Sequence, residues 1–302
     1  MPNEHPEAPR PIPFPFDDLD AARTQALARC RTLIERARAA HPDWQPPPFD
    51  PRVYARVLDI PITMSRELDR WDALLIPLGN TFKIVCNANV HSAGRRRFSI
   101  AHELGHTFFD NTLATYQMRT SQNRAQHYPT DAALQLERLC DLCAAELLMP
   151  EASFREAVER TGFRAGAIPE LARSFGVSLE AAALRFVQTS DRCCAAGFFE
   201  FSEPPRRRRC AVRPLPLETA YRARRVFRGC GFPFLFPDGK SIDDASVIVR
   251  ASLQPHELTA TEVFTLGSTT MRLRVSAIPL HRGDFVMDPP TVCVVLESGA
   301  DC

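Results

Sequence analysis

The chain contains two histidines four residues apart, His102 and His106, with a glutamate directly after the first. On an α-helix, residues at this spacing lie on one face, about 6 Å apart, so both imidazoles can reach one metal ion. Glu103, one step further round the helix, would point at a ligand of that ion. The pattern H-E-x-x-H is typical of zinc peptidases, in which the glutamate is the general base. A catalytic zinc site also needs a third protein ligand and an open position for water.

The third ligand is expected on a helix predicted at residues 134–150, LQLERLCDLCAAELLMP. Glu137 lies on this otherwise apolar helix, where an unpaired carboxylate would be costly to bury. Asp141 follows one turn later on the same face, where it can accept the free N–H of a ligating histidine and fix its tautomer. We therefore expect Glu137 to be the third ligand and Asp141 to orient a histidine. A surface salt bridge with Arg138 is the alternative role of Glu137, and Glu146 is the rival third ligand.

The residues around the motif predict a helix and a neighbouring hairpin. In FSIAHELGHTFF, residues 98–109, apolar residues recur at helical spacing. Upstream, ALLIPLGNTFKIVCN has two apolar runs around a Gly79-Asn80 turn, which predicts a β-hairpin. Its second strand, residues 82–87, either offers an edge on which an extended substrate pairs or is fully paired in its sheet. The polar, turn-rich stretch 111–133 is expected to form a surface loop or lid.

Together these residues indicate hydrolysis of a peptide bond. A zinc ion held by His102, His106 and Glu137 would lower the pKa of a water molecule toward neutrality. Glu103 would take a proton from that water and pass it to the leaving amine. Mn²⁺ is an alternative to Zn²⁺, because a site of two histidines and one carboxylate accepts other divalent ions. An oxyanion donor is also expected, and the sequence does not select among its three candidates, which are His91, Tyr116 and His127.

Two blocks, FSIAHELGHTFF and ERLCDLCAAELLMP, resemble the ImmA/IrrE-type metallopeptidases, and the likeness covers roughly residues 70–185. The resemblance implies a zincin-like peptidase fold. It also implies a substrate, since such proteins typically cleave a repressor of the helix-turn-helix class and relieve repression in a stress response, including the response to radiation and DNA damage. Cys143 departs from the family pattern, because many relatives carry an aromatic residue there, but this position does not touch the expected metal ligands.

The expected fold class is α+β, with five segments. A largely disordered, proline-rich extension at 1–18 precedes a zincin-like peptidase domain at 19–150. A small helical, helix-turn-helix-like region at 151–200 and an Arg/Pro linker at 201–210 follow. The β-rich remainder, 211–302, resembles by its position the GAF-like domain of some family members. There it would bind a small-molecule or protein effector, with plain scaffolding as the alternative.

Composition restricts the function further. The net charge of +1 argues against a protein that binds nucleic acid mainly through charge, and the cations are nearly all arginine, since Lys83 and Lys240 are the only lysines. No run of eighteen apolar residues is present, so we expect no membrane span. The N-terminus lacks the basic start and apolar stretch of a secretory signal, so we expect no export, and we interpret the ten cysteines as buried, reduced thiols of a cytoplasmic protein.

Two rival interpretations remain. IPELARSFGVSLEAAALRF outlines a helix-turn-helix, so the chain could be a transcriptional regulator that binds DNA directly and carries a non-catalytic metal site. Its second helix, however, has only Glu180 and one arginine, Arg185, and a DNA reader usually has more base-reading side chains, so direct DNA binding is not expected. Alternatively, Cys140 and Cys143 form a structural zinc or redox site, completed by Cys193-Cys194. Buried packing is preferred, because both thiols fall on the apolar face of a helix.

Overall fold

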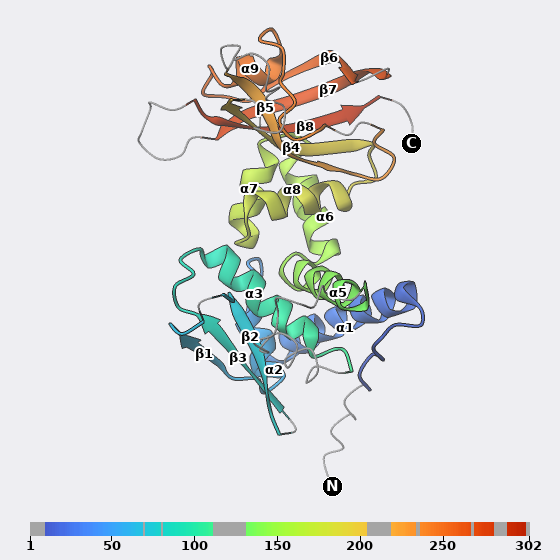
Figure 1. Cartoon of the computed structure of the whole chain (residues 1–302), viewed down its shortest axis with the longest axis vertical. Coiled ribbons are helices and arrows are strands. Elements are labelled where there is room, and N and C mark those ends of the chain that lie inside the picture. Colours follow the sequence, from blue (N-terminus) through green and yellow to red (C-terminus); the bar gives the residue numbers. More distant parts are fainter. Residues whose placement is uncertain are drawn as a thin grey trace, which may run out of the picture. The chain divides into compact units, whose positions relative to one another are not determined.

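The computed structural model of the chain describes residues 10–68, 70–79, 81–110, 131–203, 219–233, 236–266, 269–280 and 289–299. The chain forms two compact units, Met1–Pro150 with Phe175–Val177, and Glu151–Ser174 with Ser178–Cys302. Each unit combines helices with its own sheet, so the α+β class is confirmed (Figure 1). None of the described helices combines the length and apolar character needed to cross a bilayer.

The first unit contains a three-stranded sheet with the order β1-β3-β2. Its strands are β1 (Ile62–Ser65), β2 (Ala73–Leu78) and β3 (Thr81–Asn87). The predicted hairpin is confirmed, because β2 and β3 pair antiparallel, and Gly79 adopts the positive φ of 60° that the turn requires. The short strand β1 pairs parallel with the other side of β3. Both sides of β3 are paired over residues 84–87, which leaves no free edge there for a substrate, and β2 forms an edge of the sheet instead.

The described residues of this unit include four helices. They are α1 (Leu19–Ala40), α2 (Pro51–Val57), α3 (Ala93–His106) and α5 (Asp131–Leu148). Of these, α3 packs on the sheet, and α3 and α5 carry the metal motif. Helix α3 begins where the Ser92 side chain accepts a hydrogen bond from the Arg95 N–H, which caps its first turn. It buries Ile100 and Leu104. The apolar periodicity of both motif-bearing segments thus produces the two helices that the sequence predicts.

Part of the proline-rich extension is ordered, contrary to the expected disorder over 1–18. Ile12 is 2% exposed, its N–H donates to the carbonyl of Phe108 at 2.8 Å, and its carbonyl accepts from the Asp110 N–H at 2.7 Å. The ring of Phe16 packs edge-on against that of Phe109, at 5.7 Å between centroids. Apolar side chains between the prolines bury enough surface to hold the backbone, which composition alone did not indicate. Residues 1–9 lie outside the described residues.

The second unit contains a five-stranded antiparallel sheet with the order β5-β4-β8-β7-β6. Its strands are β4 (Cys194–Ser202), β5 (Ala220–Arg228), β6 (Leu258–Leu266), β7 (Thr269–Leu280) and β8 (Thr291–Ser298). Because β4 pairs with both β5 and β8, the β-rich part begins at 194 rather than at the expected 211. The apolar segment CAAGFFEFS forms this strand, so the expected helical region ends earlier, at Gln188. Linker residues 204–210 lie outside the described residues.

Helices cover both faces of this second sheet. They are α6 (Glu151–Thr161), α7 (Ala167–Phe175), α8 (Leu179–Gln188) and α9 (Val247–Ala251). Helix α9 closes a hydrophobic core on one face, and α6–α8 pack on the other (Figure 1). On that second face the N–H of Ala165 donates to the Ser276 hydroxyl of β7 at 2.7 Å. The expected pair of helices around Gly176 is present as α7 and α8, and Gly176 has a φ of 64° in the turn between them.

Candidate metal centre

Helices α3 and α5 bring together three side chains that can hold a metal ion. The Nε2 atoms of His102 and His106 lie 3.2 Å apart, and the Glu137 carboxylate lies 3.2 Å from His102 Nε2. His106 Nε2 lies 3.8 Å from the other Glu137 oxygen. In the described part of the chain, these three residues form the single group of three or more potential ligands whose donor atoms converge.

The spacing and chemistry of the group fit a small divalent ion. An ion bound tetrahedrally at about 2.1 Å from each donor would place neighbouring donors about 3.4 Å apart. The observed separations of 3.2 to 3.8 Å bracket this value. The His106 side chain is 3% exposed and that of Glu137 is 39% exposed, so one side of the group is buried while the other faces solvent. Two imidazoles and one carboxylate are a typical set for a catalytic zinc ion that keeps one position open.

Gly105 allows the two helices to approach closely enough to form this group. A Cβ added at Gly105 would lie 3.1 Å from the Cys143 Cβ and 3.3 Å from the Cys140 carbonyl oxygen, tighter than most real Cβ contacts. The backbone of α3 therefore rests almost directly on α5. Cys140 and Cys143 are both fully buried at this contact. Their position favours packing over the rival metal or redox role, and Cys193 and Cys194 belong to the second unit.

Asp141 contacts the opposite nitrogen of His102. The distance from His102 Nδ1 to Asp141 Oδ1 is 2.8 Å, so the Nδ1–H donates to the carboxylate and Nε2 faces His106 and Glu137. Burial lowers the pKa of His102, but hydrogen bonds to Asp141 and Glu137 and the nearby acidic charges raise it to about 9. In the absence of an ion, a proton on Nε2 thus occupies the space where the three donors converge.

Glu103 is buried beside this group and is held by the neighbouring sheet. Glu103 is 3% exposed, and its Oε2 accepts a hydrogen bond of 2.9 Å from the N–H of Leu75. Leu75 is on the edge strand β2. Its N–H points away from β3, so Glu103 can accept a hydrogen bond from it. The sequence pattern did not reveal the Leu75 contact, since a main-chain donor has no signature of its own.

Other candidates lie away from the group. Glu146 is also on α5, nine residues after Glu137. Nine residues are two and a half helical turns, so Glu146 lies on the opposite side of the helix from Glu137. His91 is exposed and lies before α3, whose first residue, Ala93, is about 13.5 Å along the helix from His102. Tyr116 and His127, like most of the expected lid, lie outside the described residues. The sequence pattern did not identify Phe98 as a neighbour of the group. This residue lies one helical turn before His102, and the two ring centroids are 6.3 Å apart.

Comparisons with known proteins agree on this part of the chain. Residues 56–187 match the model of peptidase family M78, the IrrE N-terminal-like domain. Over 91 residues the chain is 34% identical to the radiation response metalloprotease IrrE of Deinococcus radiodurans. The aligned residues make up 29% of this chain and 26% of that relative. The match thus spans about a quarter of the relative's length. A solved Mycobacterium tuberculosis transcriptional regulator aligns with 94% of this chain and 77% of its own, at 16% identity and a TM-score of 0.47.

Proposed function

Because residues 56–187 belong to the ImmA/IrrE-type metallopeptidases, we propose that the chain is a metal-dependent endopeptidase. His102, His106 and Glu137 hold the metal, which is zinc in our proposal, with manganese as the alternative. The observation that carries the proposal is the convergence of three donor atoms from two helices beside the buried carboxylate of Glu103. The first unit then contains a zincin-like core.

The side chains of the site divide the work of hydrolysis. A divalent ion held here supplies a Lewis acid, which acidifies water and polarises a peptide carbonyl. Glu103 accepts a proton from water and later gives it to the leaving amine. The Leu75 N–H holds Oε2 of this carboxylate in place. Asp141 holds the proton of His102 on Nδ1, which leaves the Nε2 lone pair for the ion.

The proposed substrate is a repressor protein of the helix-turn-helix class. The relative with 34% identity is described as a radiation response metalloprotease. We extend that description to this chain as a stress response, in which cleavage of the repressor relieves repression in the cytoplasm. A β-rich, GAF-like sensor in the second unit would then regulate cleavage.

The geometry of α8 speaks against the rival function of reading DNA. Arg185, the arginine of this helix, is 6% exposed, and the helix packs on β4 and β5. The Glu180 carboxylate pairs with Arg225 of β5 at 2.9 Å. A recognition helix needs cationic or amide side chains free to enter a groove, and α8 buries its one arginine. We therefore propose no direct contact with DNA.

One assay tests the proposed activity directly. The full-length protein, loaded with zinc or manganese, is incubated with helix-turn-helix repressors encoded beside its gene, and the products are analysed by mass spectrometry. We expect a single cut in one repressor, which a chelator abolishes. Cleavage that persists after complete removal of the metal would contradict the proposal.

A further inference from the structure

The second unit contains a pocket between the edge strand β6 and the segment that leads into α9. We call it the β6 pocket. Its volume is about 490 Å³, within the range of roughly 300–1,000 Å³ that is usual for sites of small molecules. Its lining consists of Phe236, Lys240, Ser241, Ile242, Asp243, Ala245, Ser246 and residues 262–265.

One part of the β6 pocket is apolar and continuous with the core of the sheet. Phe236 is 5% exposed and meets the ring of Phe264 edge-on, at 5.6 Å between centroids and an angle of 77°. Phe264 in turn packs against the core. Val263, which also lines the pocket, is 60% exposed. Together these residues can bury an aromatic or branched group.

Lys240 brings a positive charge to the β6 pocket from a rigid backbone. It follows Gly239, which has a φ of 76°, and its carbonyl accepts from the Ala223 N–H of β5 at 2.9 Å. No carboxylate lies within ion-pair distance of its ammonium in the described residues. Arginine supplies all but two of the 37 cationic side chains, so a lysine here is also unusual for this chain.

Two carboxylates complete the lining. Glu262 accepts from the Ser246 hydroxyl at 2.7 Å and from the Val247 N–H, so both of its oxygens are engaged at the start of α9. Asp243 accepts from the Ala245 N–H through Oδ1 at 2.8 Å. Its other oxygen takes part in no hydrogen bond with the described residues. The β6 pocket therefore presents a cation without an ion pair, an accessible carboxylate oxygen and an apolar floor.

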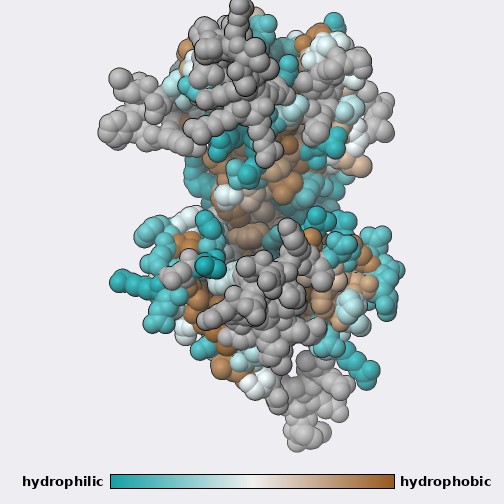
Figure 2. Space-filling view, in the orientation of Figure 1, coloured by the Kyte–Doolittle hydropathy of each residue, from teal (hydrophilic) through white to brown (hydrophobic). Residues whose placement is uncertain are grey.

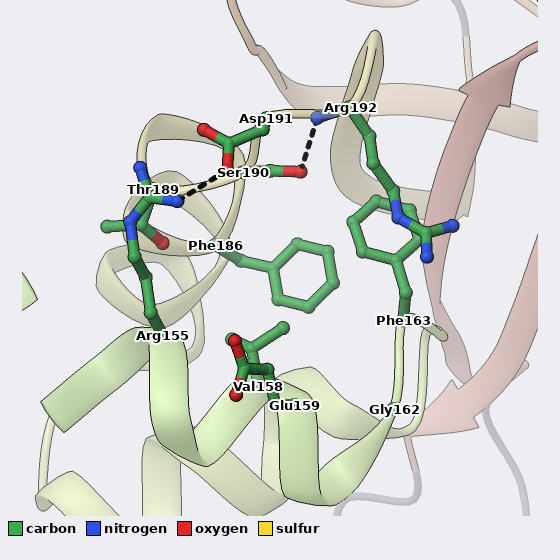
Figure 3. Close-up of a pocket in the computed structure, with 10 residues that line it drawn as sticks. All are labelled: Arg155, Val158, Glu159, Gly162, Phe163, Phe186, Thr189, Ser190, Asp191 and Arg192. Atoms are coloured by element: carbon green, nitrogen blue, oxygen red, sulfur yellow. Dashed lines mark hydrogen bonds and ion pairs between the residues drawn. The ribbon is translucent and has the colours of Figure 1, made fainter. Parts of the chain in front are cut away.

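A second pocket, between α6 and the segment that joins α8 to β4, shows what is distinctive about Lys240 (Figure 3). Its two arginines are already paired, Arg155 with Asp191 at 2.7 Å and Arg192 with Glu297 at 2.6 Å. The Arg192 guanidinium also covers the ring of Phe163, 4.6 Å from its centroid. These cations are neutralised and positioned by the protein itself, so this pocket provides no comparable charge for a ligand.

From these features we propose that the β6 pocket binds a small zwitterion with an apolar body, of the α-amino acid type. The carboxylate of the ligand pairs with Lys240, and its ammonium meets Asp243. Its side chain rests on Phe236 and Phe264. A neutral zwitterion suits this lining better than a simple anion, because Asp243 and Glu262 would repel an unaccompanied negative charge. The inference does not depend on the proposed peptidase activity, since the site lies entirely in the second unit.

The first experiment compares three probes on the full-length protein by isothermal titration calorimetry. L-Phenylalanine carries both charges, 3-phenylpropionate lacks the ammonium, and phenethylamine lacks the carboxylate. We expect saturable binding of L-phenylalanine, with each of the other two at least about tenfold weaker, or about 1.4 kcal/mol. No saturation by L-phenylalanine up to about 10 mM, or equal binding of either truncated probe, would overturn the inference.

The second experiment removes each charge of the site in turn. Lys240→Met deletes the cation, and Asp243→Asn deletes the negative charge while its amide oxygen can still accept from Ala245. Both side chains belong to the surface segment, so we expect thermal unfolding to remain as in the unmodified protein. We expect each variant to bind L-phenylalanine at least about tenfold more weakly. Lys83→Met, at the only other lysine, is the matched control and should bind normally. Undiminished binding by Lys240→Met would refute the site.

Discussion

The carboxylate of Glu103 on α3 accepts a hydrogen bond of 2.9 Å from the main-chain N–H of Leu75 on β2. A helix that carries the proposed metal ligands and a strand at the edge of the sheet are thus joined through the proposed catalytic base itself. A buried carboxylate with one oxygen fixed in this way has little freedom to turn, and the orientation of a proton acceptor is part of its catalytic efficiency.

Glu103→Gln should retain the metal but abolish cleavage. The substituted amide can still accept from Leu75 through its oxygen, so the fold and the three ligands are preserved while the proton acceptor is lost. We expect the rate of repressor cleavage to fall by about 10²–10⁴-fold. Metal content measured by atomic absorption provides the control. A variant that still cleaves at the normal rate would remove Glu103 from its role.

Leu75→Pro should impair catalysis through the loss of one N–H. Proline is tolerated at edge positions whose N–H does not enter the sheet, and Pro77 already occupies such a position on the same strand. We expect kcat to fall by about tenfold or more, with KM and metal content unchanged, because Glu103 is then free to turn. Leu75→Ala keeps the N–H and is the matched control. If the two variants lose activity equally, the hydrogen bond has no separate effect.

Gly105→Ala should weaken metal binding and stability together. The new methyl group would press on Cys140 and Cys143 and move α3 away from α5, which separates the histidines from Glu137. Overpacking of this kind costs typically about 1–3 kcal/mol, measurable as a lower denaturant midpoint. Gly299→Ala, where nothing lies within 4 Å of the added methyl group, is the control. Unchanged zinc affinity in Gly105→Ala would show that the close contact is not required.

Binding of the metal should release a proton near neutral pH. In the metal-free protein the pKa of His102 is about 9, so below that pH its Nε2 carries a proton that an ion must displace. Affinity should therefore rise with pH up to about 9 and then level off. Calorimetry in buffers of different ionisation enthalpy measures the protons released, and a pH-independent affinity between pH 6 and 9 would contradict the assignment.

The same raised pKa has a consequence for the stability of the metal-free protein. A histidine whose pKa is higher in the folded than in the unfolded state stabilises the fold below its unfolded pKa, and this contribution disappears as pH rises through the folded value. The His102 pKa moves from 6.5 to about 9. The contribution of His102 to the free energy of unfolding should therefore be present at pH 6 and lost by about pH 10. Asp141→Ala removes a hydrogen bond that raises the pKa of His102, so the unfolding free energy of this variant should depend less on pH in this window.

Helical periodicity made the convergence of the candidate ligands predictable, whereas the pairing between distant segments was not predictable. His102 with His106, and Glu137 with Asp141, are each four residues apart, so helical geometry alone puts each pair on one face. The same geometry also excludes Glu146, which lies two and a half turns from Glu137. In contrast, β1 has four residues and no distinctive alternation, so its pairing with β3 depends on tertiary contacts. The burial of Ile12 depends on Phe108 and Asp110, nearly a hundred residues away.

Helices α1 and α2 both contact α5, the helix that carries Glu137. The Cys30 thiol contacts the Cys143 carbonyl at 3.8 Å, and the Tyr54 hydroxyl donates to the Leu147 carbonyl at 2.9 Å. Both contacts come from residues that precede the family match, which begins at residue 56. A recombinant fragment cut to the boundaries of that match would expose the apolar rear surface of α5 to water, and for biochemical work the domain has to start upstream of Ile12.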